Sequence, residues 1–261
     1  MMHNHMDRMN SVLSADNVAV VTGAARGIGR ALVHVLEARG MRVIAVDIDQ
    51  EQLATLGAGE ARVLDVAEPA ALEALAEELG EVSLLVNNAV TRIGRGFDAS
   101  LEDWRKAVEI NLWGVIHGCR SFLPRMAEPG MIINLGSKQG ITNPPGHPVY
   151  NLCKAAIKSY TESLSHDLLN RDITAHLLVP GWTSDDTGAQ GRGAWTSEQL
   201  VSHAIERLAA GEFYIVCPDG EVTADMDRAR ILWGAGDITE NRPPLSRWHP
   251  DWKDRAKEAL E

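Results

Sequence analysis

The feature that most constrains the fold is a glycine-rich turn that follows a short apolar run near the N-terminus. Val18–Thr22 has the length and β-branched content of a buried strand, and the next residues, GAARGIG at 23–29, lead into a helix-like segment. Gly23 permits a tight turn, Gly27 lets the backbone approach a pyrophosphate, and Gly29 allows the helix to pack closely on the strand. The helix N-terminus offers unpaired N–H groups and the positive end of its dipole. The sequence therefore predicts a dinucleotide-binding turn rather than glycines that only interrupt a loop.

Beyond this turn, short apolar runs alternate with segments of helical periodicity. Such alternation is typical of a parallel sheet covered by helices, and runs that are apolar at consecutive positions indicate strands buried on both faces. The expected strands are Val18–Thr22, Arg42–Val46, Arg62–Leu64, Leu84–Val86, Met131–Leu135, Ala175–Val179 and Phe213–Val216. The expected helices are Ile28–Ala38, Pro69–Leu79, Leu101–Leu123, Tyr150–Leu169 and Ser197–Ala209. We therefore predict an α/β fold with one doubly wound domain, a seven-stranded parallel sheet and helices on both faces.

Composition and charge exclude several other classes of protein. Of the 261 residues, 45% are hydrophobic and 23% are charged, as in globular rather than disordered or fibrous proteins. A net charge of −11 disfavours nucleic acid and anionic lipid as partners, and no run reaches the roughly 18 apolar residues of a membrane span. Residues 1–16 lack the apolar core of a secretory signal and are expected to form a flexible polar leader. The three cysteines contain no CxxC pair, which favours a reducing cytoplasm and no metal site.

The end of the second expected strand bears on which dinucleotide would bind. Asp47 follows that strand, where a carboxylate can hold the adenosine ribose hydroxyls and repel a 2′-phosphate. Ile48 adds no positive charge, whereas Arg26 within the glycine turn could attract a 2′-phosphate. Together with Ile28 at the start of the helix, these residues are expected to contact the cofactor. The balance of charges favours NAD over NADP.

Three residues in the middle of the chain form a candidate catalytic set. Tyr150 and Lys154 are four residues apart on an expected helix, so their side chains share one face. A tyrosine hydroxyl is a poor base at neutral pH, but a neighbouring ammonium stabilises its phenolate form. Ser137 follows the strand Met131–Leu135 and can hydrogen-bond a substrate oxygen, holding it for proton exchange with Tyr150. With the dinucleotide turn, this set predicts hydride transfer between a nicotinamide and a substrate carbon.

In these motifs the chain resembles the short-chain dehydrogenase/reductase family, of the shorter type with the spacings TGxxxGxG and YxxxK. The resemblance implies a Rossmann-type sheet of strand order 3-2-1-4-5-6-7 and a homotetramer or dimer. It also implies that Asn111 completes the catalytic set by positioning a water that links Lys154 to solvent, and that Lys154 binds the nicotinamide ribose. Further cofactor contacts are implied for Asp65 and Val66 at the adenine, for Asn88 beside the cofactor, and for Pro180, Gly181 and Thr183 at the nicotinamide.

The sequence departs from the family pattern mainly towards its C-terminal end. Val90 replaces a family glycine beside the cofactor, and a position that usually holds threonine is occupied by Asp185. Residues 182–196 predict a lid over the substrate, with Trp182 as the side chain best placed to cover it. Residues 218–261 form an atypical tail, which is expected to pack on the body of the protein or on a neighbouring subunit.

Several loop residues near the expected crevice are candidates for contact with a substrate. Arg92 and Arg95 follow the fourth strand, where crevice loops border a substrate, and they could bind a carboxylate. Surface arginines are nevertheless common, so solvation alone also accounts for them. His147, close to Tyr150, has no evident partner and is more typical of a solvated loop residue.

The expected function is that of an NAD-dependent alcohol dehydrogenase or carbonyl reductase acting on a small or medium secondary alcohol or ketone. One alternative is a dinucleotide-sensing protein without turnover, although such a protein would usually lack the tyrosine or the lysine. Another is a lyase or isomerase that uses the same tyrosine with no net change in the redox state of the nicotinamide. The expected partners are a small-molecule substrate and other copies of the chain, with no nucleic acid and no membrane.

Overall fold

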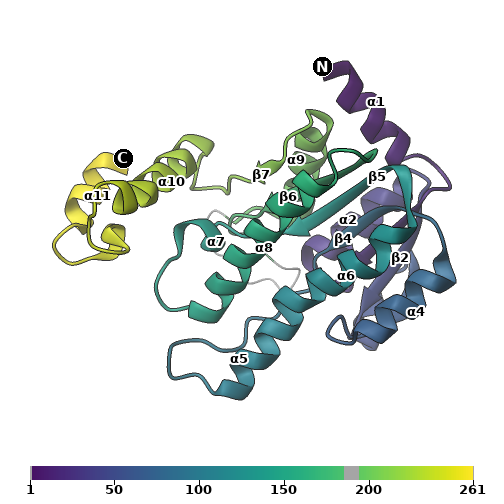
Figure 1. Ribbon diagram of the computed structural model, residues 1–261, viewed down its shortest axis with the longest axis horizontal. Coiled ribbons are helices and arrows are strands. Elements are labelled where there is room, and N and C mark those ends of the chain that lie inside the picture. The colour runs from purple at the N-terminus through teal and green to yellow at the C-terminus, as the bar shows by residue number, and fades with distance from the viewer. Residues whose placement is uncertain (1, 185–193, 261) are drawn as a thin grey trace.

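The computed structural model describes residues 2–184 and 194–260, which contain one sheet of seven parallel strands (Figure 1). The strands are β1 (Val18–Thr22), β2 (Arg42–Asp47), β3 (Glu60–Val63), β4 (Val82–Asn87), β5 (Met126–Leu135), β6 (Ile173–Val179) and β7 (Tyr214–Val216). Their order is β3-β2-β1-β4-β5-β6-β7, so the winding reverses between β1 and β4. This order confirms the predicted doubly wound sheet. It places a crevice beyond the carboxyl ends of β1 and β4, where folds of this kind bind ligands.

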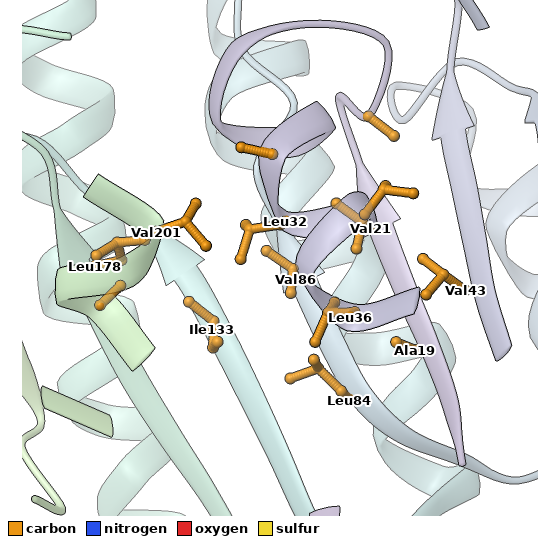
Figure 2. Close-up of a cluster of buried hydrophobic side chains, with 14 of the residues drawn as sticks. Ala19, Val21, Leu32, Leu36, Val43, Leu84, Val86, Ile133, Leu178 and Val201 are labelled. Atoms are coloured by element: carbon orange, nitrogen blue, oxygen red, sulfur yellow. The ribbon is translucent and has the colours of Figure 1, made fainter. Parts of the chain in front are cut away.

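Alternate residues of the central strands face two separate layers of helices. The first layer is α2 (Gly27–Ala38) with α9 (Ser197–Ala209), and the second is α4 (Pro69–Leu79), α6 (Gly114–Phe122) and α8 (Pro148–Asp167). In β1, Val21 belongs to the core under the first layer and Val20 to the core under the second. Figure 2 shows the first core, where Leu32 of α2 and Val201 of α9 lie against side chains of the sheet. Both faces are thus buried, as the continuous apolar runs predicted.

The long helix predicted over residues 101–123 is interrupted. It consists of α5 (Leu101–Val108), a π-helical turn (Glu109–Trp113) and α6. A π-helical turn changes the direction of the side chains it carries, and such turns are frequent at functional sites. Asn111 lies within this turn and is buried. The other helices are α1 (Met2–Val12), α3 (Gln50–Ala54), α7 (Gln139–Thr142), α10 (Ala224–Thr239) and α11 (Lys253–Leu260).

The expected flexible leader is instead a helix, which corrects the sequence interpretation. Its apolar residues Met9 and Val12, and Leu13 directly after it, recur at helical spacing and are buried in the first core. The helix α1 lies against α9 and β5, and Arg8 forms an ion pair with Asp172 at the start of β6. The polar composition of the segment concealed this narrow apolar stripe. No helix in the described residues is long and apolar enough to cross a bilayer.

The C-terminal tail has a folded structure of its own. Helices α10 and α11 extend from β7 away from the sheet, and α10 lies beside α7 (Figure 1). The Arg242 guanidinium carbon lies 4.2 Å from the centre of the Trp233 ring, within range of a cation–π contact. The indole N–H of Trp233 donates to Ser246 Oγ at 2.7 Å. The tail is therefore held together by its own tryptophan and arginine contacts, in addition to its contact with α7.

Candidate active site

The candidate site is a cavity of about 550 Å³ at the carboxyl ends of the central strands. Of the residues predicted from the sequence, its lining includes Gly23, Arg26, Gly27, Ile28, Asp47, Ile48, Asn88, Ser137, Tyr150, Lys154, Pro180, Gly181 and Thr183. The predicted phosphate turn and the predicted catalytic set therefore share one cavity. A pocket of this size and position is a suitable place for a dinucleotide and a small substrate.

The geometry of the glycine turn matches what a pyrophosphate requires. Gly23 and Gly27 have φ angles of +64° and +52°, which favour glycine. A Cβ on Gly29 would lie 2.1 Å from the Gly23 carbonyl oxygen, so this residue, which is not part of the lining, allows the close contact that closes the turn. Around Gly27, by contrast, a Cβ would meet only Ser197 Oγ, at 3.8 Å. Helix α2 begins there without a side-chain cap, which leaves its first N–H groups available to a phosphate.

Asn88, which directly follows β4, stabilises this turn through hydrogen bonds from its side chain and backbone. Its side-chain amide donates to the carbonyl oxygens of Thr22 and Gly23, each at 2.9 Å. Its backbone N–H and that of Ala89 donate to Thr22 Oγ1, at 3.0 and 3.1 Å. These bonds tie the ends of β1 and β4 together. Thr22 was not recognised as a site residue, although it opens the TGxxxGxG motif.

The end of the cavity where the adenosine is expected carries one carboxylate, that of Asp47, with no described cation paired to it. Asp47 accepts the N–H groups of Ala25 and Asp49, each at 3.0 Å, and forms no ion pair with a described residue. Arg26, in contrast, is ion-paired with Asp49, which the sequence analysis did not single out. The Gln52 N–H donates to Asp49, and this bond, with the Arg26 contact, lowers the pKa of the Asp49 carboxyl. The charge of Arg26 is thus compensated, whereas that of Asp47 is not.

The two residues expected at the adenine lie outside the described lining of the cavity. Asp65 accepts the N–H of Ala67 at 2.9 Å and so stabilises the turn after β3. Val66 is buried against α6, where a Cβ on Gly114 would lie 2.7 Å from its Cγ2. The structure gives both residues a local structural role, and their contact with an adenine stays a prediction.

The predicted catalytic side chains come together from β5 and α8. Lys154 is buried, and its Nζ donates to the Leu135 carbonyl at 2.7 Å and lies 5.7 Å from the centre of the Tyr150 ring. Burial lowers the pKa of Lys154 to about 8. Ser137 Oγ accepts the N–H of Gln139 at 3.2 Å, and its own hydroxyl hydrogen is free to donate to a ligand. A phenol, an ammonium and a hydroxyl donor thus border one cavity.

Asn111 does not line the described cavity and acts on the loop that follows β4. Its Oδ1 accepts the N–H of Thr91 at 2.7 Å, and its Nδ2 donates to the Thr91 carbonyl at 2.9 Å. The π-helical turn directs the side chain to this loop, which also carries Val90 and Arg92. The structure therefore shows Asn111 as a positioning residue, while its expected role in holding a water near Lys154 stays a prediction.

A buried ion cluster connects Gly181, in the segment expected to contact the nicotinamide, to the tail. A Cβ on Gly181 would lie 2.8 Å from Asp219 Oδ2 and 2.9 Å from Lys138 Nζ. Lys138 Nζ lies 2.6 Å from Asp227 Oδ2 at the start of α10 and 3.4 Å from Asp219 Oδ2. Because Lys138 directly follows Ser137, the cluster holds the tail against the catalytic strand end. No sequence pattern predicts this cluster, because Lys138 and Asp219 are 81 positions apart and neither belongs to a motif.

The base of the expected lid is closed by backbone hydrogen bonds. The N–H of Trp195 donates to the Trp182 carbonyl at 3.1 Å, and that of Ser184 donates to the Trp195 carbonyl at 2.9 Å. Trp182 itself is 68% exposed and, like Arg95 and His147, does not belong to the described lining. Asp185 and the rest of 185–193 lie outside the described residues, so the lid stays a prediction.

Comparison with known proteins gives consistent matches. The family model described as short chain dehydrogenase matches residues 17–194. The 3-oxoacyl-[acyl-carrier-protein] reductase FabG of Escherichia coli (strain K12) is 35% identical over 181 residues, which cover 65% of this chain and 74% of that protein. The putative oxidoreductase SadH of Mycobacterium tuberculosis is 34% identical over 167 residues, covering 58% of this chain and 60% of that protein.

Solved structures of two further proteins have the same fold. A short-chain dehydrogenase/reductase from Burkholderia phymatum in complex with NAD superimposes with a TM-score of 0.77 at 28% identity, covering 88% of this chain and 96% of that one. A putative short-chain dehydrogenase from Novosphingobium aromaticivorans gives a TM-score of 0.74 at 27% identity and covers 94% of each chain. Residues 195–261, which include α9, β7 and the tail, lie beyond the match to the family model.

Proposed function

Because this chain belongs to the short-chain dehydrogenase/reductase family, we propose that it interconverts a small or medium secondary alcohol and the corresponding ketone. The observation that carries the proposal is the shared cavity. The uncapped N-terminus of α2 borders it beside the glycine turn, and Ser137, Tyr150 and Lys154 border it as well. A nicotinamide dinucleotide fits these residues, since Gly27 leaves open space and free N–H groups where a pyrophosphate would lie.

Each residue of the set has a distinct part in the proposed reaction. A bound nicotinamide supplies the acceptor or donor of the hydride. Tyr150 takes the hydroxyl proton of the alcohol during oxidation and returns it to the ketone oxygen during reduction. Ser137 donates a hydrogen bond to the same oxygen. The Lys154 ammonium stabilises the phenolate of Tyr150, because an opposite charge nearby favours the ionised form.

For the cofactor we favour NAD over NADP. Asp47 would accept hydrogen bonds from the ribose hydroxyls and repel a 2′-phosphate. Arg26, which could have attracted that phosphate, is already paired with Asp49. The solved Burkholderia phymatum relative in complex with NAD is consistent with this choice.

The variant Asp47→Asn tests the choice of cofactor. In the parent protein we expect NADH to bind more tightly than NADPH, and in the variant we expect this preference to fall by about 10- to 100-fold, because a charged hydrogen-bond acceptor is lost. Fluorescence titration of both dinucleotides measures the two affinities. The variant Asp49→Asn removes a charge two residues away and should instead improve NADPH binding by freeing Arg26. Equal affinities of the parent for the two dinucleotides would refute the NAD assignment.

A spectrophotometric assay tests the activity itself. Reduced-nicotinamide absorbance would be followed with NAD and NADP separately, against polyols, hydroxy acids, aryl carbinols, steroids and short aliphatic alcohols at mildly alkaline pH. A 3-oxoacyl thioester belongs in the reverse assay, because the Escherichia coli relative is a 3-oxoacyl reductase by name. Turnover of one class would support the dehydrogenase. Tight NADH binding without turnover would favour the sensor or the redox-neutral enzyme instead.

Assembly and location are also proposals. We infer a homotetramer or dimer from family membership. A reducing cytoplasm suits the three cysteines, which are all buried as free thiols.

A further inference from the structure

A second cation lies beside the catalytic tyrosine. The guanidinium carbon of Arg92 lies 5.6 Å from the centre of the Tyr150 ring, and Arg92 is part of the cavity lining. Lys154 Nζ lies at 5.7 Å from the same ring. Arg92 is also close enough to Lys154 to contribute to the lowered pKa of that amine. Two positive groups thus lie within 6 Å of the centre of the Tyr150 ring.

Arg92 differs from the other two cations in the described lining, Arg26 and Lys154, because its guanidinium has no described polar partner, whereas Lys154 donates to the Leu135 carbonyl. Arg26 is paired with Asp49, and Lys138 lies between Asp219 and Asp227. Among the described residues, Arg92 has neither a hydrogen bond to its guanidinium nor a carboxylate partner. The guanidinium of Arg92 therefore borders the cavity with its N–H donors available to an anionic ligand.

Resting on the proposed function, we infer that Arg92 binds the carboxylate of the substrate and that the enzyme acts on short hydroxy acids or oxo acids. A guanidinium presents a planar set of N–H donors that matches a carboxylate and stays charged at every working pH. Since Arg92 lies against the Tyr150 ring, a carboxylate bound to it is separated by only a few bonds from a carbonyl oxygen held by Tyr150 and Ser137. This spacing suits 2- and 3-oxo acids.

The position of Arg92 is fixed by the fold. The two hydrogen bonds between Asn111 and the backbone of Thr91 hold the residue directly before it. A Cβ on Gly94, two residues later, would lie 2.9 Å from Val149 Cγ1, so the loop also packs closely on the start of α8. The arginine backbone is therefore anchored on both sides, although its side chain is exposed. The fixed backbone lowers the entropic cost of binding an anion, although the exposed side chain must still be ordered on binding.

Matched pairs of acids and neutral esters test this inference. The substrates are lactate and 3-hydroxybutyrate, each beside its methyl ester, assayed with both dinucleotides in the parent protein and in the variants Arg92→Gln and Arg95→Gln. Arg95 lies in the same loop but outside the described lining, so its variant controls for the loss of one positive charge. For the acids we expect Arg92→Gln to lower kcat/KM by about 10- to 100-fold, mostly through KM, because a charged hydrogen bond is lost. The esters and Arg95→Gln should be unaffected.

Binding without turnover provides a second readout. Malonate, which carries carboxylates but no carbinol, should bind to the parent protein with NADH present, and calorimetry should detect at least about 10-fold weaker binding to Arg92→Gln. NADH affinity should be the same in both proteins.

Three outcomes would overturn the inference. The first is turnover of esters or other neutral alcohols with no preference for the acids, which would leave the proposed function standing. The second is an equal loss of kcat for acids and esters in Arg92→Gln, which would mean that Arg92 acts on Tyr150 and does not bind the carboxylate of the substrate. The third is malonate binding that does not change with Arg92. If no alcohol were turned over but malonate binding still depended on Arg92, the result would count against the proposed function and support the carboxylate site.

Discussion

A Tyr150→Phe variant is expected to bind the dinucleotide as the parent does and to lose about 10²- to 10⁴-fold in kcat, the range contributed by general acid–base catalysis. The substitution removes the only group proposed to exchange a proton with the substrate. It should not disturb the fold, because the Tyr150 hydroxyl forms no hydrogen bond with a described residue. The ring, which packs beside Lys154 and Arg92, is retained. Steady-state kinetics and fluorescence titration of NADH measure the two effects separately.

Tyr214→Phe is the matched control for this variant. The Tyr214 hydroxyl bonds to Glu162 on α8, away from the cavity lining, so its removal should leave kcat unchanged. If Tyr150→Phe retained parental turnover, the proposed mechanism would be wrong. If it lost both turnover and NADH affinity, Tyr150 would be needed for the cofactor rather than for proton transfer.

The sheet could be predicted from the sequence because its central strands are specified locally, whereas β3, which has no buried residue, begins two residues before its predicted start. Continuous apolar runs such as that of β1 indicate burial on both faces, and only helices can cover both faces of a parallel sheet. The ends of helices were also predictable where capping residues mark them. Thr196 and Gln199 form a capping box at the start of α9, whose predicted bounds agree with the structure.

What could not be predicted depends on contacts between distant segments. The polar residues 2–12 form a helix only because α9 and β5 offer an apolar surface to Met9 and Val12. The helical periodicity of residues 101–123 is continuous, so it does not predict the π-helical turn that contains Asn111. The tail is held together by contacts such as the cation–π contact between Arg242 and Trp233, and no sequence motif predicts such contacts.

The same distinction holds within the candidate site. Residues in short motifs, such as Gly23, Tyr150 and Lys154, can be predicted from their spacing together with the place of each motif among the strands and helices. The residues that pair with or lie beside the charged groups of these motifs could not be predicted in this way, because they lie on other segments of the chain. Asp49 compensates Arg26 from the start of α3, and the relation of Arg92 to Tyr150 emerges only when the loop after β4 meets α8.

Lys154→Met is expected to abolish most of the activity and yet to stabilise the protein. Lys154 is buried with a single hydrogen bond, to the Leu135 carbonyl, and burial lowers its pKa from the ordinary 10.5 to about 8. At neutral pH the folded protein therefore holds a buried ammonium, at a cost of up to about 3 kcal/mol. Methionine has a similar shape and no charge, so it should recover a large part of this cost. Turnover should fall because the phenolate of Tyr150 loses its nearest ammonium.

The pH dependence of unfolding gives this prediction a distinct signature. Below pH 8 the lysine is charged in both the folded and the unfolded protein, and the folded protein carries the whole cost. Between pH 8 and 10.5 the folded protein releases the Lys154 proton first, so the contribution of this lysine to the free energy of unfolding rises with pH, against the opposite contributions that the raised pKa values of the buried cysteines and of Tyr160 make in parent and variant alike. In Lys154→Met this rise should be absent. Denaturant titrations of the cofactor-free proteins from pH 7 to above pH 10 would measure it.

Lys158→Met, one turn further along α8, is the control for the same change in chemistry. Lys158 is partly exposed and paired with Glu162, so its replacement should alter stability by no more than about 1 kcal/mol and leave turnover intact. Reduced stability of Lys154→Met at pH 7, or an unchanged pH dependence, would contradict a costly buried ammonium. A gain in stability together with a loss of turnover would mean that Lys154 is retained for the chemistry of the site and at the expense of the fold.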